Sequence, residues 1–147
     1  MIPQNKQIKE LETEKNSHRA TFKLGDEIGW RRIAKIGESI LNARFYISTN
    51  GNGITSMTLD VISLKGWEPW LNIEIYKYSN SMKRHNKARL LTLGNKETFL
   101  EIYDSMGQNN NGILTTYVDN ADGVELMRKE IIVPEDVSGY IKTQINF

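Results

Sequence analysis

The sequence predicts a single all-β domain, and an antiparallel β-sandwich in particular. About nine short runs of residues alternate between apolar and polar side chains, and turn-forming residues separate them at intervals of roughly 8–12 residues. No segment within these runs has the length and periodicity of an ordinary helix. A chain of 147 residues has the usual size of one domain, and it can bury a sufficient core without a metal or a disulfide. We therefore assign residues 28–147 to one sandwich domain.

The first 27 residues differ from the rest, because the segment begins with a polar stretch rich in Lys, Glu, Gln and Asn. Ile8 and Leu11 fall on one face of a helix, but Lys15 and His18 occupy the next positions of that stripe. A single apolar pair is too little for a coiled coil. We interpret residues 1–27 as a short helix or stem, and a frayed terminus is the alternative.

The strands of the first half follow in chain order. Residues 30–36 and 43–49 form the first two β-like runs, and the sequence Asn-Gly-Asn-Gly follows at residues 50–53. Two Asn-Gly steps predict a hairpin, because both residue types tolerate positive φ. Residues 54–64 then alternate between apolar and polar side chains, which is typical of a strand with one buried face.

The second half of the chain continues the pattern. Residues 71–78 form the clearest strand, since Leu71, Ile73 and Ile75 point one way and polar side chains point the other. Residues 119–123 superficially resemble a calcium-binding loop, but the glycine that an EF-hand needs at its sixth position is missing, so a hairpin turn is the better interpretation. Further strands are predicted at residues 88–93, 98–104, 113–118, 124–133 and 140–147.

Charge and cysteine content exclude several classes of function. The formal net charge is +1, which is unlike the strongly basic surface of a dedicated nucleic-acid-binding protein. Without cysteine the chain has no disulfide, thiolate zinc site or cysteine nucleophile, and we expect no metal and no cofactor. No apolar run is long enough for a membrane span, and the first thirty residues lack the apolar core of a signal peptide.

Aromatic side chains give one candidate ligand site. Trp67 and Trp70 fall in a predicted turn, and Tyr76 and Tyr78 fall on the polar side of a strand, as Tyr103 does on another. Exposed rings of this kind stack on sugars, but Trp and Tyr also bury in cores and at subunit contacts. Burial is the favoured interpretation, and a carbohydrate-binding module that uses the two tryptophans and two of these tyrosines is the alternative function.

A basic stretch gives a second candidate site. Lys83, Arg84, Lys87 and Arg89 place four permanent positive charges within seven residues. Such a patch can contact anionic glycans or phosphates, although a solvated loop is the simpler interpretation because the overall charge is balanced.

No catalytic constellation stands out. His18 and His85 both fall in polar segments, and we expect them to be exposed at the surface. Glu74 and Glu101 fall on the polar side of strands and are explained as solvated side chains. A glycan-degrading enzyme that uses Glu74, Glu101 or Asp104 as acids is the third hypothesis.

The order of the strand motifs resembles a known family. Trp30-Arg31-Arg32-Ile33-Ala34-Lys35 opens the series, Arg89-Leu90-Leu91 comes later, and Phe99-Leu100-Glu101-Ile102-Tyr103 follows it. In this order the motifs resemble the C-terminal β-sandwich knob of bacteriophage tail-fibre and appendage proteins, over residues 28–147. The family has no fixed set of functional residues, and its fibres usually carry a long shaft where this chain has a short polar lead.

The resemblance implies a jelly-roll sandwich, a homotrimer and a location in the virion. It implies a non-enzymatic role in fibre assembly or host-surface attachment, with a surface glycan as one expected partner. Residues 1–27 are then expected to dock the knob to other virion proteins, either as a separate subunit or as part of a longer protein. Several weak sites on a trimer add their affinities through effective concentration.

Overall fold

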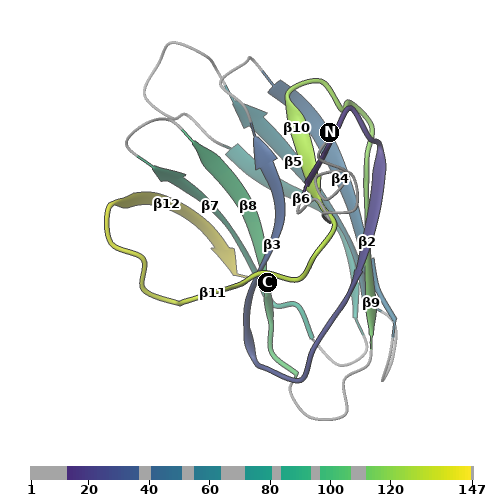
Figure 1. The fold of residues 1–147 in the computed structure, drawn as a ribbon, viewed down its shortest axis with the longest axis vertical. Coiled ribbons are helices and arrows are strands. Elements are labelled where there is room, and N and C mark those ends of the chain that lie inside the picture. The colour runs from purple at the N-terminus through teal and green to yellow at the C-terminus, as the bar shows by residue number, and fades with distance from the viewer. Residues whose placement is uncertain are drawn as a thin grey trace, which may run out of the picture.

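The computed structural model describes residues 13–36, 41–50, 55–63, 72–80, 84–93, 97–106 and 112–146. Within these ranges the chain forms twelve β-strands and no helix (Figure 1), so the all-β prediction is confirmed. The strands are β1 (Thr13–Lys15), β2 (Arg19–Lys23), β3 (Gly29–Ile36), β4 (Leu41–Thr49), β5 (Thr55–Ser63), β6 (Asn72–Asn80), β7 (Lys87–Leu93), β8 (Thr98–Asp104), β9 (Ile113–Val118), β10 (Val124–Met127), β11 (Ile132–Val133) and β12 (Tyr140–Asn146).

The strands make two antiparallel sheets that pack face to face, which confirms the sandwich. Sheet A has the order β1-β10-β3-β8-β7-β12, with β11 also paired to β3, and sheet B has the order β2-β9-β4-β5-β6. Without β6, β7, β11 and β12, the remaining strands make two four-stranded sheets in the orders β1-β10-β3-β8 and β2-β9-β4-β5. This alternation of paired strands between two sheets is the winding of a jelly roll.

The N-terminal boundary of the sandwich lies earlier than Ile28. β1 pairs with β10, and β2 pairs with β9 from Arg19 to Lys23. Both strands lie inside the segment expected to be a stem, and Thr13–Lys15 and Arg19–Lys23 belong to the two sheets instead. The sequence does not reveal them because edge strands are short and carry little apolar pattern: β2 buries only Ala20 and Phe22. Residues 1–12 lie outside the described part of the chain.

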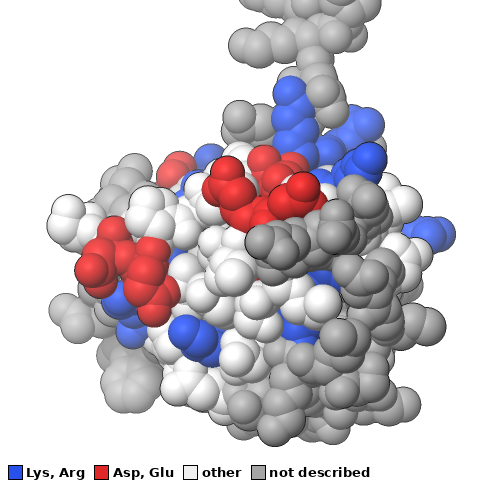
Figure 2. Space-filling model, turned by 90° about the horizontal axis from the view of Figure 1, so that it is seen from below, with Lys and Arg blue, Asp and Glu red and all other residues white. Residues whose placement is uncertain are grey.

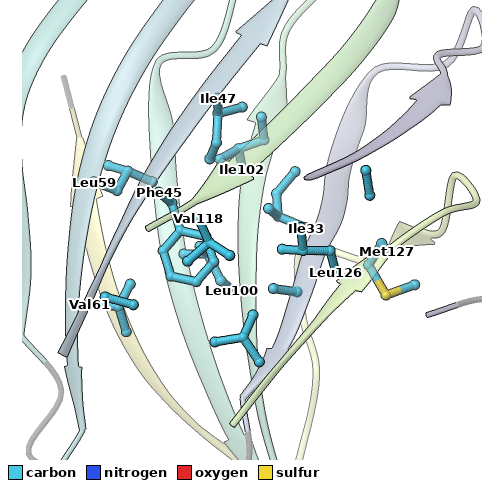
Figure 3. Close-up of a cluster of buried hydrophobic side chains, with 14 of the residues drawn as sticks. Ile33, Phe45, Ile47, Leu59, Val61, Leu100, Ile102, Val118, Leu126 and Met127 are labelled. Carbon is cyan, nitrogen blue, oxygen red and sulfur yellow. The ribbon is translucent and has the colours of Figure 1, made fainter. Parts of the chain in front are cut away.

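The main core fills the space between the sheets. β5 contributes Met57, Leu59 and Val61 at alternate positions, as its sequence predicts. Phe45 of β4 lies beside Val118 at the centre of this cluster, and both are fully buried (Figure 3).

Of the two turns discussed above, one is a hairpin as predicted and the other is not. β4 pairs with β5 up to Thr49 and Thr55, which confirms the hairpin predicted from the Asn-Gly steps. Residues 119–123 do form a turn, in which Gly123 has a φ of 78°. It is not a hairpin, however, because it connects β9 of sheet B to β10 of sheet A. The single strand expected at residues 124–133 is divided into β10 and β11.

A second, smaller core lies on the outer face of sheet A. β11 runs beside β3, β12 lies on the far side of β7, and residues 134–139 connect them. We call residues 134–139 the crossover segment, because they pass over the outer face of sheet A. Trp30, Leu91 and Val133 pack together there. This cover decides which polar side chains of sheet A reach solvent.

Candidate functional site

The aromatic residues proposed for ligand binding are only partly described. Trp67 and Trp70 lie outside the described residues. Tyr76 and Tyr78 belong to β6, the last strand of sheet B, where Tyr78 pairs with Met57. Their side chains are also outside the description, so a site built on these four residues stays a prediction.

The basic stretch does not form a solvent-facing patch. Arg84 is 2% exposed and Arg89 is fully buried, whereas Lys83 lies outside the described residues. Lys87 is half-buried, with its Nζ 4.2 Å from the centre of the Tyr103 ring. Charge is also mixed at the end of the molecule shown in Figure 2, where acidic side chains form two groups and Lys and Arg side chains are scattered among them.

Arg89 is buried because the crossover segment covers it. Its Nε donates to Glu101 over 2.8 Å, and its two Nη atoms donate to the backbone carbonyls of Pro134 and Glu135. Glu101 is also fully buried, which corrects its interpretation as a solvated side chain. Its second oxygen accepts from Arg32 Nε over 3.0 Å. Glu101 therefore lies between two arginines as a structural anion, out of reach of a substrate.

Arg84 is buried in a second ionic cluster at the end of the sandwich. Its Nε lies 3.1 Å from Oδ1 of Asp104, which is also fully buried. Arg31 lies 4.0 Å from the same carboxylate and 2.8 Å from Glu130. Gly112 closes the cluster: a Cβ added there would lie 2.1 Å from the Asn50 carbonyl oxygen and 3.0 Å from Arg84. Asp104 is thus held by arginines in the interior.

His85 is buried, so its expected exposure is wrong. It links the two sheets: Nδ1 lies 3.0 Å from the carbonyl oxygen of Tyr103 in β8, and Nε2 lies 2.8 Å from the hydroxyl of Thr49 in β4. A neutral ring that donates from Nδ1 and accepts from Thr49 satisfies both contacts. Desolvation by burial lowers the pKa of His85 to about 4.

The contact between Thr49 and His85 is not an accessible nucleophile–base pair. Thr49 is 1% exposed and His85 is fully buried. The second ring nitrogen faces a backbone carbonyl, where a catalytic triad has a carboxylate. His18, by contrast, is exposed as expected.

An apolar pocket of about 310 Å³ opens beside the crossover segment. Its walls include Trp30 and Tyr103, whose rings meet edge to face at 5.4 Å, and Trp30 Nε1 donates to the carboxylate of Glu135. Ile28 and Ile132 also line it and are 57% and 39% exposed. These two aliphatic side chains give the pocket a partly exposed apolar rim.

The outer face of sheet B carries a row of exposed rings. Tyr117 of β9 and Tyr46 of β4 are directly opposite each other in the register, with ring centres 5.8 Å apart. His18 continues the row, 6.3 Å from Tyr117. Tyr46 and Tyr117 are 43% and 46% exposed. We call this surface of His18, Tyr46 and Tyr117 the tyrosine face.

A row of hydroxyl groups runs beside the tyrosine face. Thr21 pairs with Thr115, Thr115 with Ser48, and Ser48 with Ser56, across β2, β9, β4 and β5. Thr115 and Ser48 lie two positions along their strands from Tyr117 and Tyr46, and therefore share the same face about 7 Å away. Each of the four side chains is exposed or half-buried.

The sequence analysis did not predict the tyrosine face, although the sequence does indicate the orientation of one of its residues. The alternation of Phe45, Tyr46 and Ile47 predicts that Tyr46 points away from the core. Its pairing with Tyr117 depends on β4 lying beside β9, which local pattern does not reveal.

Comparisons with known proteins add no identification. No protein-family model, characterised protein or solved structure matches the chain. Among the described residues no group of three His, Asp or Glu side chains is placed to hold a metal ion. In the same part of the chain no helix is long and apolar enough to cross a membrane. Inferences about function therefore rest on the geometry above.

Proposed function

We propose that the chain is a non-enzymatic structural or attachment domain of a phage particle and that it acts as a homotrimer. This proposal rests chiefly on how the side chains are distributed. Two of the three candidate acids, Glu101 and Asp104, are buried against arginines, and the side chain of Glu74 lies outside the description. By contrast, Ile28, Ile132 and Tyr117 are exposed. A rigid sandwich with exposed apolar and aromatic contacts suits binding better than acid–base chemistry.

The residues that carry the resemblance to fibre knobs meet in space. Trp30, Arg89, Glu101 and Tyr103 come from β3, β7 and β8, three neighbouring strands. The guanidinium of Arg89 lies 4.1 Å from the Trp30 ring centre and pairs with Glu101. The motifs that resemble those of fibre knobs thus form one cluster beneath the crossover segment, which is consistent with a structural role for them and supplies no binding site.

The apolar pocket supports the homotrimer. Ile28 and Ile132 lie at one end of the sandwich, close to the crossover segment, and a second copy of the chain is the partner proposed for them. Closed cyclic symmetry repeats such a contact without open-ended growth. In this proposal the residues that precede β1 dock the trimer to other particle proteins, and the trimer multiplies weak contacts with the host surface.

The solution mass tests the proposal. Light scattering of the purified protein at micromolar concentration is expected to give three times 16.9 kDa. A stable monomer contradicts the trimer and moves the function towards a free carbohydrate-binding module.

A further inference from the structure

We propose that the tyrosine face binds a pyranose oligosaccharide, with a sugar ring stacked on Tyr117 and a second contact on Tyr46. The inference rests on the proposed attachment function and names the class of its ligand. It places the ligand on strands β9 and β4, on residues other than the aromatic ones that the sequence indicates.

The rings are positioned to contact a sugar. A pyranose ring presents C–H groups on its faces, and these pack on the face of an aromatic ring. Tyr117 lies between the other two rings, with its centre 6.3 Å from His18 and 5.8 Å from Tyr46, and its plane is inclined by 31° to the first and by 52° to the second. Both tyrosines retain more than two-fifths of their surface for a ligand.

The hydroxyl row completes the chemistry that a sugar requires. Hydroxyl groups radiate from the edge of a pyranose, and each both donates and accepts hydrogen bonds, as Ser and Thr do. Ser48 and Thr115 lie one step along β4 and β9 from the two tyrosines. A sugar on the rings therefore has matching polar groups at one edge.

The site is held in place before the ligand arrives. The residues lie on neighbouring strands, and His18 Nδ1 is 2.9 Å from the carbonyl oxygen of Val118. Arg44 is fixed by Asp60 at 2.9 Å, and hydrogen bonds to Asp60 and to Tyr46 raise the pKa of Arg44. A ring that is already fixed loses little conformational entropy when it binds.

A sugar suits this surface better than a second protein. A stable subunit contact has an apolar centre, whereas the tyrosine face is flanked by hydroxyl groups and by the Arg44–Asp60 pair. The exposed aliphatic side chain nearest on the same strand is Ile113, four residues from Tyr117. The tyrosine face therefore combines aromatic rings with hydroxyl groups, and these match the C–H groups on the face of a pyranose and the hydroxyl groups at its edge.

Titration of the full chain with defined sugars tests the inference. The probes are cellohexaose, maltohexaose, chitohexaose and sialyllactose, with mannitol as a polyol that lacks a ring. Binding is followed through the NMR signals of the tyrosine and histidine rings. Tyr117→Ala is expected to weaken binding by at least about tenfold, as for a central contact residue. Tyr117→Phe, which keeps the ring, and Ile113→Ala, on the same strand and face, are expected to retain it.

Each outcome separates this inference from the proposed function. Failure of the wild-type protein to bind any of the four sugars, or equal loss in Tyr117→Ala and Ile113→Ala, overturns the inference and leaves the trimer intact. A Tyr117→Ala variant that changes solution mass makes the face a subunit contact and also overturns it. A monomer that binds sugar through Tyr117 supports the inference and contradicts the particle function. Thermal unfolding confirms that each variant is folded, and a matching loss in Tyr46→Ala with retention in Tyr46→Phe supports the site independently.

Discussion

Single buried residues of this protein carry charge that the fold must compensate. Glu101 is the clearest case, because it is fully buried between Arg89 and Arg32 on the outer face of sheet A. Loss of one partner of a buried pair is costly because it leaves an uncompensated charge in the interior. A half-exposed pair such as Lys35 and Glu97, at 3.2 Å, is partly screened by solvent.

Glu101→Gln is therefore expected to lower the free energy of unfolding by about 3–5 kcal/mol, because Arg89 loses its anion. Glu97→Gln, one residue before the start of β8, is the matched control and is expected to cost less than about 1 kcal/mol. Urea unfolding monitored by circular dichroism measures both. Equal effects of the two substitutions contradict the structural role of Glu101.

His85 makes the stability depend on pH. Its pKa is about 4 in the folded protein and about 6.5 when unfolded, so the unfolded chain takes up the proton first. The contribution of His85 is fully present above pH 6.5 and is lost as the pH falls towards 4, by roughly 3 kcal/mol over that range. Urea unfolding at pH 7 and pH 4.5 is expected to show a shallower fall in His85→Gln than in wild type. The same pH dependence in both proteins excludes His85 as its source, and His18→Gln serves as the exposed control.

At the scale of the structural elements, the crossover segment determines which side chains on the outer face of sheet A are buried. It buries Arg89 and seats Val133 against Trp30 and Leu91. Trp30 holds it by packing and by the hydrogen bond to Glu135. The segment is thus a third layer over one part of the sandwich, separate from the core between the sheets.

Trp30→Ala is expected to cost about 3–5 kcal/mol of unfolding free energy and to loosen this layer first. Hydrogen exchange should accelerate in β11 and β12 more than in β4 and β5. Phe45→Ala in the main core is the comparison, with a similar loss of stability and no preference for β11 and β12. Uniform acceleration in Trp30→Ala would show that the crossover segment is not an independent layer.

The sequence predicts the positions of the strands better than it predicts which polar side chains are buried. Alternation correctly places Met57, Leu59 and Val61 in the core, because a strand's side-chain period is local. Burial of Arg84 and Arg89 depends on contacts with distant segments, and a polar stretch therefore looks like an exposed patch. Whether a side chain is buried depends on which distant segments pack against it, and a short stretch of sequence does not show this.

The same limit applies to the candidate site. Tyr46 is readable as outward-facing from its neighbours, but its partner Tyr117 lies 71 residues further along the chain and meets it only through the β4–β9 pairing. The early strands were missed for a different reason: β1 is only three residues long, and β2 buries only two apolar side chains. Their stability comes from pairing with β10 and β9 more than from their own residues.

At the scale of the whole molecule, the jelly roll separates two surfaces. The apolar pocket with Ile28 and Ile132 lies beside sheet A, and the tyrosine face lies on the outside of sheet B. One surface is proposed to join copies of the chain, and the other to contact the ligand. A trimer built through the first leaves three copies of the second available for multivalent binding.

The solution masses of wild type, Ile28→Asp/Ile132→Asp and Ile113→Asp, measured side by side by light scattering, test this account most directly. The substituted isoleucines are all exposed, so each variant is expected to fold. The wild type and Ile113→Asp are expected at three times 16.9 kDa, and Ile28→Asp/Ile132→Asp at 16.9 kDa, because a carboxylate at an apolar contact is left without a partner. A wild-type monomer, or a trimer that survives in Ile28→Asp/Ile132→Asp, contradicts the assembly proposed here.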